Sequence, residues 1–167
     1  MPDEPRAFTI LIVEHNRFFR DALHEALQTR FIFPLLPRSA SIQSALAKID
    51  AMRPDMIFVD VNLPDGNGLE LTRRLRAAGN DAVISILTHH DLPEYRQEAT
   101  RSGADHLFVK GSTDIGEIYA AVESTLAARF RTRIVSEQAP YGDQVSALLS
   151  DTRLSVRTRP NGTSTWA

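Results

Sequence analysis

Short apolar runs alternate with amphipathic segments along the first 130 residues, and this alternation restricts the fold more than any other feature. The apolar runs are FTILIV (8–13), FIFPLL (31–36), MIFV (56–59), VISIL (83–87) and HLFV (106–109). Runs that are apolar throughout are typical of strands buried on both faces, as in a parallel sheet covered by helices. The second run is the weakest candidate, because the proline within it favours an edge strand.

The segments between these runs have helical periodicity. The pattern predicts helices over residues 17–30, from 42 up to the proline at 54, after Asn67, over 92–102, and from Asp114 onward to Arg133. Five strand–helix units of this kind indicate a doubly wound α/β domain with right-handed crossovers. Arg73, Arg74 and Arg76 are expected on the exposed face of the third helix.

The composition changes after residue 130, where Pro, Gly, Ser, Thr and Arg become frequent. We therefore predict one domain over residues 1–130 and a partly disordered extension over 131–167 with no output domain. Within the extension only the segment 143–150, DQVSALLS, has an amphipathic pattern that a further short helix would need. The extension holds five arginines, but it has neither a recognition helix nor interleaved aromatic residues, so nucleic-acid binding by this chain is not expected.

Several classes of protein are excluded by composition. The chain has 167 residues, no cysteine and a formal net charge of -2, which removes disulfides, thiolate metal sites and a broadly basic surface. No apolar run approaches the roughly 20 residues that span a bilayer, and the sequence MPDEPRAF is unlike a signal peptide. We expect a cytoplasmic protein without membrane contact.

Polar residues follow four of the five predicted strands. They are Glu14 and His15 after the first strand, Asp60 after the third, Thr88, His89 and His90 after the fourth, and Lys110 after the fifth. Ligands of an open parallel sheet bind at the carboxyl ends of its strands, so these side chains should meet in one crevice. Carboxylates, a hydroxyl and an ammonium together suit phosphoryl chemistry, with a carboxylate as nucleophile and a divalent cation held by the acids.

Residues 8–130 resemble the receiver domain of two-component response regulators. The resemblance rests on LIVE at the first strand end, IFVDVNLPDGNGLEL around Asp60, SILT at Thr88 and GADHLFVK ending at Lys110. It implies a flavodoxin-like sheet with strand order 2-1-3-4-5. It also implies that Asp60 accepts a phosphoryl group from a sensor histidine kinase or a histidine phosphotransfer protein, and that the chain signals to a downstream protein and is not an enzyme.

The same resemblance assigns roles to the other site residues. Thr88 would hydrogen-bond the phosphoryl group and Lys110 would pair with it. Magnesium would be held by Asp60, by Glu14 through water and by the main-chain carbonyl of Asn62. The fourth helix, fifth strand and fifth helix would form the output face, with Arg96, Arg101 and Tyr119 as candidates for it.

Three positions depart from the receiver pattern. His15 stands where receivers carry a second acid that ligates magnesium directly, and imidazole is a poor ligand for that ion, so we expect weak magnesium binding and slow phosphorylation. His89 stands where a small residue usually follows the threonine. Leu107 replaces the aromatic residue that usually couples to the threonine, which puts that coupling in doubt.

These departures leave alternatives open. One is a pseudo-receiver that binds partners without phosphorylation, and another is the receiver part of a truncated DNA-binding response regulator. A dehalogenase-like phosphatase also uses an aspartate nucleophile, but it needs a second aspartate two residues later, where this chain has Asn62. His15, His89 and His90 could instead hold zinc or another transition metal with Asp60 or Glu14. The long last helix could also pair with its twin in a homodimer.

Overall fold

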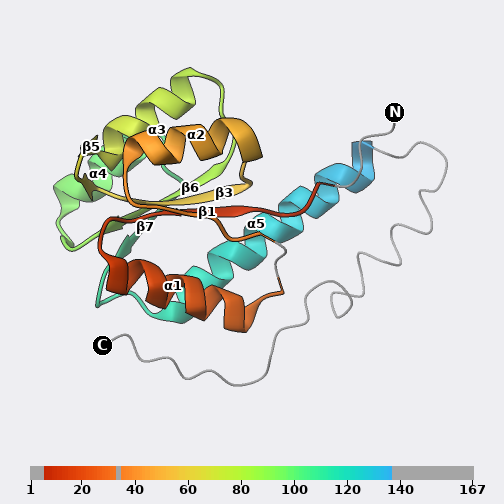
Figure 1. Ribbon diagram of the computed structural model, residues 1–167, viewed down its shortest axis with the longest axis horizontal. Coiled ribbons are helices and arrows are strands. Elements are labelled where there is room, and N and C mark those ends of the chain that lie inside the picture. Colours follow the sequence, from red (N-terminus) through yellow and green to blue (C-terminus); the bar gives the residue numbers. More distant parts are fainter. Residues whose placement is uncertain (1–5, 33–34, 137–167) are drawn as a thin grey trace.

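The computed structural model describes residues 6–32 and 35–136, in which a central parallel sheet lies between two layers of helices (Figure 1). The sheet strands are β1 (Ile10–Val13), β2 (Arg38–Ser39), β3 (Met56–Asp60), β6 (Val83–Thr88) and β7 (His106–Val109). The helices are α1 (Arg17–Arg30), α2 (Ile42–Met52), α3 (Gly68–Ala77), α4 (Pro93–Ser102) and α5 (Ile115–Ser136). A separate two-stranded hairpin is formed by β4 (Asn62–Leu63) and β5 (Gly66–Asn67).

The strands are ordered β2-β1-β3-β6-β7 and every pair is parallel. Counting only the sheet strands along the chain, this is the order 2-1-3-4-5, which confirms the flavodoxin-like prediction. The register pairs Val13 with Val59, Asp60 with Leu87 and Thr88 with Val109. The carboxyl ends of β1, β3, β6 and β7 therefore lie at one edge of the sheet, next to the reversal in strand order between β1 and β3.

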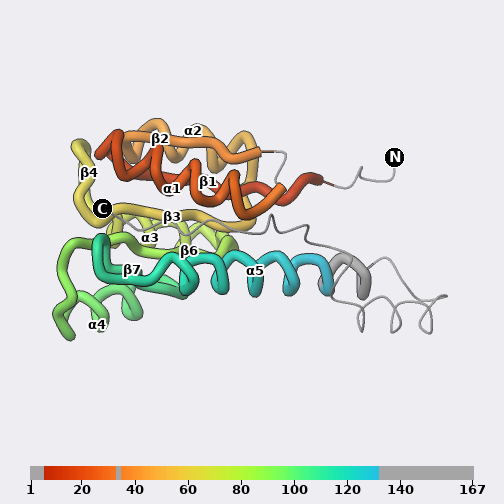
Figure 2. The backbone as a smooth tube through the Cα atoms, turned by 90° about the horizontal axis from the view of Figure 1, so that it is seen from below, coloured from red at the N-terminus to blue at the C-terminus, as the bar shows by residue number. Residues whose placement is uncertain are grey.

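Each face of the sheet is covered by its own apolar core. Helices α2, α3 and α4 pack on one face through residues such as Ile49, Leu71 and Ala99. Helices α1 and α5 pack on the other face through residues such as Leu27 and Val122. Figure 2 looks onto this second face, where the two helices run beside each other. The apolar runs are buried because both sides of each strand face a helix layer.

Side-chain caps explain where three of the helices begin. Asn16, Ser41 and Asn67 precede α1, α2 and α3, and their side-chain oxygens accept hydrogen bonds from Phe19 N, Ser44 N and Leu69 N. Such residues satisfy backbone N–H groups that the first helical turn leaves unpaired. The cap predicted at Asn67 is confirmed, so the helix after the third strand starts immediately beyond the hairpin.

The second strand differs from the predicted one. The sequence placed it in the apolar run 31–36, but β2 is the two-residue segment Arg38–Ser39, and Leu35 makes only an isolated bridge to Thr9. Ile12 N–H donates to the carbonyl of Pro37 and Glu14 N–H donates to that of Ser39. A proline lacks the N–H that a ladder requires, which explains why regular pairing is confined to the residues after Pro37.

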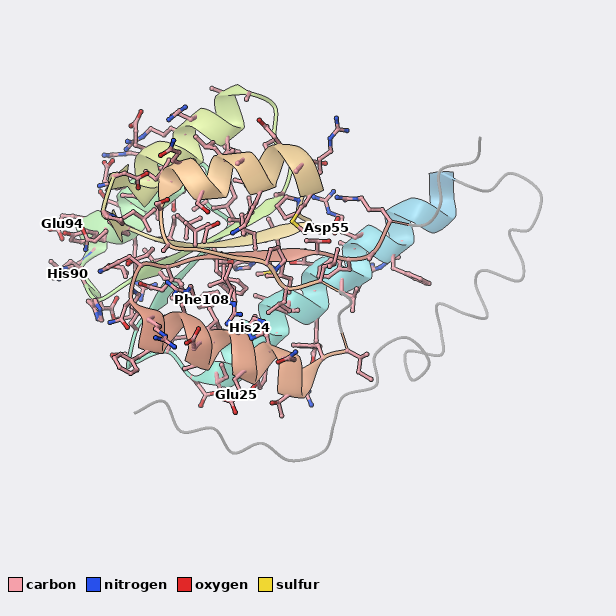
Figure 3. All side chains as sticks on the ribbon, viewed as in Figure 1. His24, Glu25, Asp55, His90, Glu94 and Phe108 are labelled. Carbon is pink, nitrogen blue, oxygen red and sulfur yellow. The ribbon has the colours of Figure 1, made fainter. Side chains whose placement is uncertain are left out.

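The amino end of β3 is held by ion pairs. Asp55, which is buried, accepts hydrogen bonds from the backbone N–H of Thr9 and from the guanidinium of Arg6, and Arg129 Nε of α5 lies 3.9 Å from it. Arg129 also binds the carboxylate and the carbonyl of Asp81. Figure 3 shows Asp55 and His90 at opposite ends of the sheet, so this cluster is remote from the predicted site.

One prediction about a surface residue is wrong, and a second residue is less exposed than an interaction surface would favour. Arg76 is not part of a solvated face: it donates to the carbonyls of Asn80, Ala82 and Gly103 and pairs with Asp105, so it joins α3 to the loops that precede β6 and β7. Tyr119, the candidate for the output face on α5, turns towards α1. It is part-buried against α1, where its hydroxyl lies 3.4 Å from the carbonyl of Ala26.

Helix α5 runs past the domain boundary predicted at residue 130 and extends beyond the sheet (Figure 1). The extension over 137–167, with its candidate helix at 143–150, lies outside the described residues. None of the helices in the described part of the chain is long and apolar enough to cross a membrane.

Candidate functional site

The site lies where β1, β3 and β7 end. Glu14 and Asp60 are 0% and 2% exposed, although both are acids, and the Lys110 side chain is 3% exposed. Lys110 Nζ lies 2.5 Å from Glu14 Oε2 and 3.1 Å from Asp60 Oδ2. One buried ammonium therefore pairs with both carboxylates, which offsets the cost of removing these charges from water.

Backbone groups hold the other carboxylate oxygens. Glu14 Oε1 accepts from the N–H of Asn16 at 2.8 Å, and Asp60 Oδ1 accepts from the N–H of Asn62 at 3.2 Å. Each acid thus uses one oxygen for Lys110 and the other for the N–H two residues later in the chain. This fixes the orientation of both side chains.

Burial raises the pKa of Glu14 above its usual value, and the negative charge of Asp60 raises it further. Lys110 and the Asn16 N–H act in the opposite direction because they stabilise the charged form. Burial is the largest of these effects.

His15 contributes the third group of the cluster. Its Nδ1 lies 3.1 Å from Asp60 Oδ2 and 3.5 Å from Glu14 Oε1, while its side chain is 51% exposed. The ring therefore spans from solvent to both carboxylates. Among the described residues, Glu14, His15 and Asp60 form the one group of three acids or histidines whose ligand atoms lie within 4.8 Å of one another.

The other predicted residues stand around this cluster. Thr88 is buried at the end of β6; its carbonyl accepts from the N–H of Lys110 at 2.7 Å, and its Oγ1 accepts from the N–H of His90 at 3.1 Å. The His90 ring stacks on Tyr95 of α4, with centroids 5.1 Å apart. Both His89 and His90 are exposed and neither belongs to the metal-ligand group, so the proposed zinc set is reduced to His15 and the two acids.

Leu107 and its neighbour occupy opposite faces of the sheet. Leu107 packs against the core under α2, α3 and α4, whereas Phe108 lies in the core under α1 and α5, with its ring 6.3 Å from that of Phe58. An aliphatic side chain in this position has no polar group to exchange between solvent and interior. The packing of Leu107 is thus consistent with the sequence analysis, which put the usual coupling to Thr88 in doubt.

Sequence reasoning missed three residues that shape the site. Phe19 of α1 places its ring 5.0 Å from Lys110 Nζ, and Arg20 donates to the carbonyl of Glu14 at 2.8 Å. Gly68 begins α3 next to the backbone of Asp60, where a Cβ atom would lie 2.1 Å from the Asp60 carbonyl oxygen. A glycine directly after a helix cap was the available signal for that close approach.

The donor set fits a divalent cation in part. Two carboxylates supply the hard oxygen ligands that magnesium prefers, but the third group in reach is an imidazole nitrogen. The site therefore offers fewer oxygen ligands from side chains than an all-acid cluster would.

A family model described as the response regulator receiver domain matches residues 10–123. The chain belongs to this family. Among curated proteins, it is 32% identical over 120 residues to the DNA-binding transcriptional activator DevR/DosR of Mycobacterium tuberculosis, covering 72% of this chain and 55% of that protein. It is 31% identical over 150 residues to the response regulator MprA of Mycobacterium ulcerans, covering 90% of this chain and 61% of that protein.

Solved structures of receivers share this fold. A two-component response regulator of the LuxR family from Aurantimonas superposes with a TM-score of 0.66 at 27% identity, covering 74% of this chain and 87% of that one. The chemotaxis protein CheY4 of Vibrio cholerae superposes with a TM-score of 0.63 at 26% identity, covering 71% of this chain and 98% of that one. This receiver thus spans less than two thirds of the two curated relatives, but nearly the whole of CheY4.

Proposed function

We propose that Asp60 accepts a phosphoryl group from a phosphohistidine of a sensor histidine kinase or histidine phosphotransfer protein, and that the modified receiver signals through protein–protein contacts. The observation that carries this proposal is the pairing of one buried ammonium with both buried carboxylates, Lys110 with Glu14 and Asp60. Family membership supports it, because receivers act with histidine kinases.

The chemistry is a phosphoryl transfer between two side chains. An oxygen of the Asp60 carboxylate attacks phosphorus, an O–P bond forms, the N–P bond breaks, and its electron pair returns to the partner's imidazole. Lys110 already lies 3.1 Å from Asp60, where its charge offsets the negative charge that the phosphoryl oxygens bring. The Thr88 hydroxyl, which accepts from the His90 N–H, retains its own proton for donation to a phosphoryl oxygen.

Magnesium is part of the proposal. Asp60, Glu14 through water and the Asn62 carbonyl would hold it, and when bound it would supply positive charge to the phosphoryl oxygens. Because His15 takes the place of a second acid, we propose weak affinity and a raised magnesium requirement.

Intact-mass spectrometry after incubation with a small phosphodonor, with and without magnesium, tests the proposal. We expect one added phosphoryl group in the wild type and none in Asp60→Asn. Asp50→Asn is a matched control, because Asp50 is an exposed acid of α2 outside the site, and it should keep the adduct. A phosphohistidine donor is then tried if the small donor fails. An adduct that survives in Asp60→Asn, or no adduct from either donor, would contradict the proposal.

Two observations favour a phosphorylation-independent receiver as the second candidate. His15 Nδ1 already contacts Asp60 Oδ2, and Leu107 lacks the ring that couples phosphorylation to the surface in most receivers. In that case Asp60→Asn would leave partner binding unchanged. The relatives named as DNA-binding or response regulators also allow this receiver to be one part of a DNA-binding regulator, which would give DNA binding only together with an output domain.

A further inference from the structure

We propose that Glu14, His15 and Asp60 form a site for a first-row divalent transition ion, with His15 Nδ1 as a direct ligand, and that this site prefers such an ion to magnesium. The inference rests on the proposed phosphoacceptor site for its location. It adds the class of metal ion that the site binds. Neither family membership nor the names of the relatives specify that class for a chain with a histidine at position 15.

The first argument is the distance between donor atoms. His15 Nδ1 lies 3.1 Å from Asp60 Oδ2 and 3.5 Å from Glu14 Oε1. Metal–ligand bonds of about 2.1 Å to nitrogen and oxygen place adjacent donors about 3.0 Å apart in an octahedron and about 3.4 Å apart in a tetrahedron. The two separations are therefore close to those of ligands that share one ion.

The second argument is that the donors are held in place. Asn16 N–H binds Glu14 Oε1 and Asn62 N–H binds Asp60 Oδ1, and both carboxylates are almost fully buried. The His15 ring, in contrast, is half exposed, so solvent can reach its side of the cluster and supply the remaining ligands as water. Fixed carboxylates with one open side are the arrangement of an exchangeable metal site.

The third argument is charge and ligand type. Glu14, Asp60 and Lys110 together carry one net negative charge when ionised, and Lys110 Nζ contacts an oxygen of each acid. This weakens the purely electrostatic attraction on which magnesium depends. Imidazole binds cobalt, nickel, copper and zinc far better than magnesium, so a nitrogen ligand compensates for the lost charge only with those ions.

Calorimetric titration of the untagged, unphosphorylated 167-residue chain with Co²⁺, Zn²⁺ and Mg²⁺, without any phosphodonor, tests the inference. We expect Zn²⁺ and Co²⁺ to bind at least about 100-fold more tightly than Mg²⁺. His15→Asp should reduce that ratio by at least about tenfold, because it replaces the nitrogen ligand with a hard oxygen. The Co²⁺ absorption spectrum and the ¹⁵N shift of His15 Nδ1 on Zn²⁺ addition report ligation directly.

The double variant His89→Ala, His90→Ala is the matched control, since both histidines are exposed and lie outside the cluster. It should retain the wild-type affinities. The inference is overturned if His15→Asp leaves the ratio unchanged, or if transition-ion binding disappears in the double variant. His15→Gln supplies no imidazole nitrogen and adds no charge, so it should also lose Co²⁺ affinity. This second variant shows whether the effect of His15→Asp comes from the lost ligand or from a change in folding caused by the added charge. Because no phosphodonor is used, a chain that binds Co²⁺ through His15 but never forms an Asp60 adduct would refute the proposed function alone.

Discussion

Gly68→Ala offers a demanding test of how the backbone around Asp60 is packed. A Cβ atom at this position would lie 2.1 Å from the Asp60 carbonyl oxygen, 2.9 Å from its carbonyl carbon and 2.8 Å from Val59 Cγ1. Since Cβ atoms essentially never approach other atoms within 3.0 Å, the start of α3 and the end of β3 must separate by about 0.9 Å. Two of the three contacts are backbone atoms, so a side-chain rotation cannot relieve them.

The expected cost follows from that displacement. Overpacking of this kind lowers the free energy of unfolding by about 1–3 kcal/mol, and a shift of about 1 Å in a reacting group can slow its reaction about 100-fold. Helix propensity alone predicts the opposite sign, because alanine in a helix is about 1 kcal/mol more favourable than glycine. The sign of the stability change therefore distinguishes steric overlap from propensity.

Urea denaturation and the initial rate of Asp60 phosphorylation measure the two effects. Gly79→Ala is the matched control: its φ of +77° makes alanine unfavourable there, but a Cβ would meet nothing within 4 Å. It should lose stability while the phosphorylation rate stays unchanged. A Gly68→Ala variant that is as stable as the wild type and is phosphorylated at the same rate would refute the packing argument.

Two further substitutions test other parts of the domain. Burial raises the Glu14 pKa, so the folded chain retains a proton that the unfolded chain has released, and the free energy of unfolding falls as pH rises above about 4.5. In urea denaturation measured over a series of pH values with EDTA present, Glu14→Gln should remove this fall in the free energy of unfolding. The same pH dependence in the wild type and in Glu14→Gln would contradict the assignment of the raised pKa to Glu14. Arg76→Lys should cost about 1–3 kcal/mol, because an ammonium cannot replace the fork that binds three carbonyls. The exposed control Arg74→Lys should change little, and equal unfolding midpoints for both variants would count against the role of Arg76.

The fold was predictable because local signals agreed with one another. Continuous apolar strands, helical periodicity and the cap at Asn67 all indicated the same α/β arrangement, and α1 spans the predicted residues 17–30. The position of β2 was not predictable from hydrophobicity, since the ladder avoids the proline-containing apolar run and uses the polar pair Arg38–Ser39. Edge strands carry the weakest pattern because only part of their surface is buried.

The residues that form the site were predictable from the sequence, but the contacts between them were not. Strand ends indicated that Glu14, Asp60 and Lys110 would gather at one edge, because parallel strands bring their carboxyl ends together. No pattern in the sequence tells that Lys110 binds both acids or that His15 turns its Nδ1 towards them, since these depend on side-chain torsions. Arg76 shows the same limit: its helical position indicated an exposed face, while its length let it reach carbonyls on other loops.

Strand β3 carries a carboxylate near each end, and the two differ in what neutralises them. Asp55, just before the strand, contacts Arg6, Arg129 of α5 and the Thr9 N–H, so its partners come from the segment before β1 and from the last helix. Asp60, at the other end, is neutralised by the buried side chain of Lys110, which also pairs with Glu14. The carboxylate before the strand thus lies beside two guanidinium groups, whereas the one at its end shares a single ammonium with another acid. Negative charge added at Asp60 therefore draws on the same ammonium that neutralises Glu14, so a change of charge at either acid alters the electrostatic environment of the other.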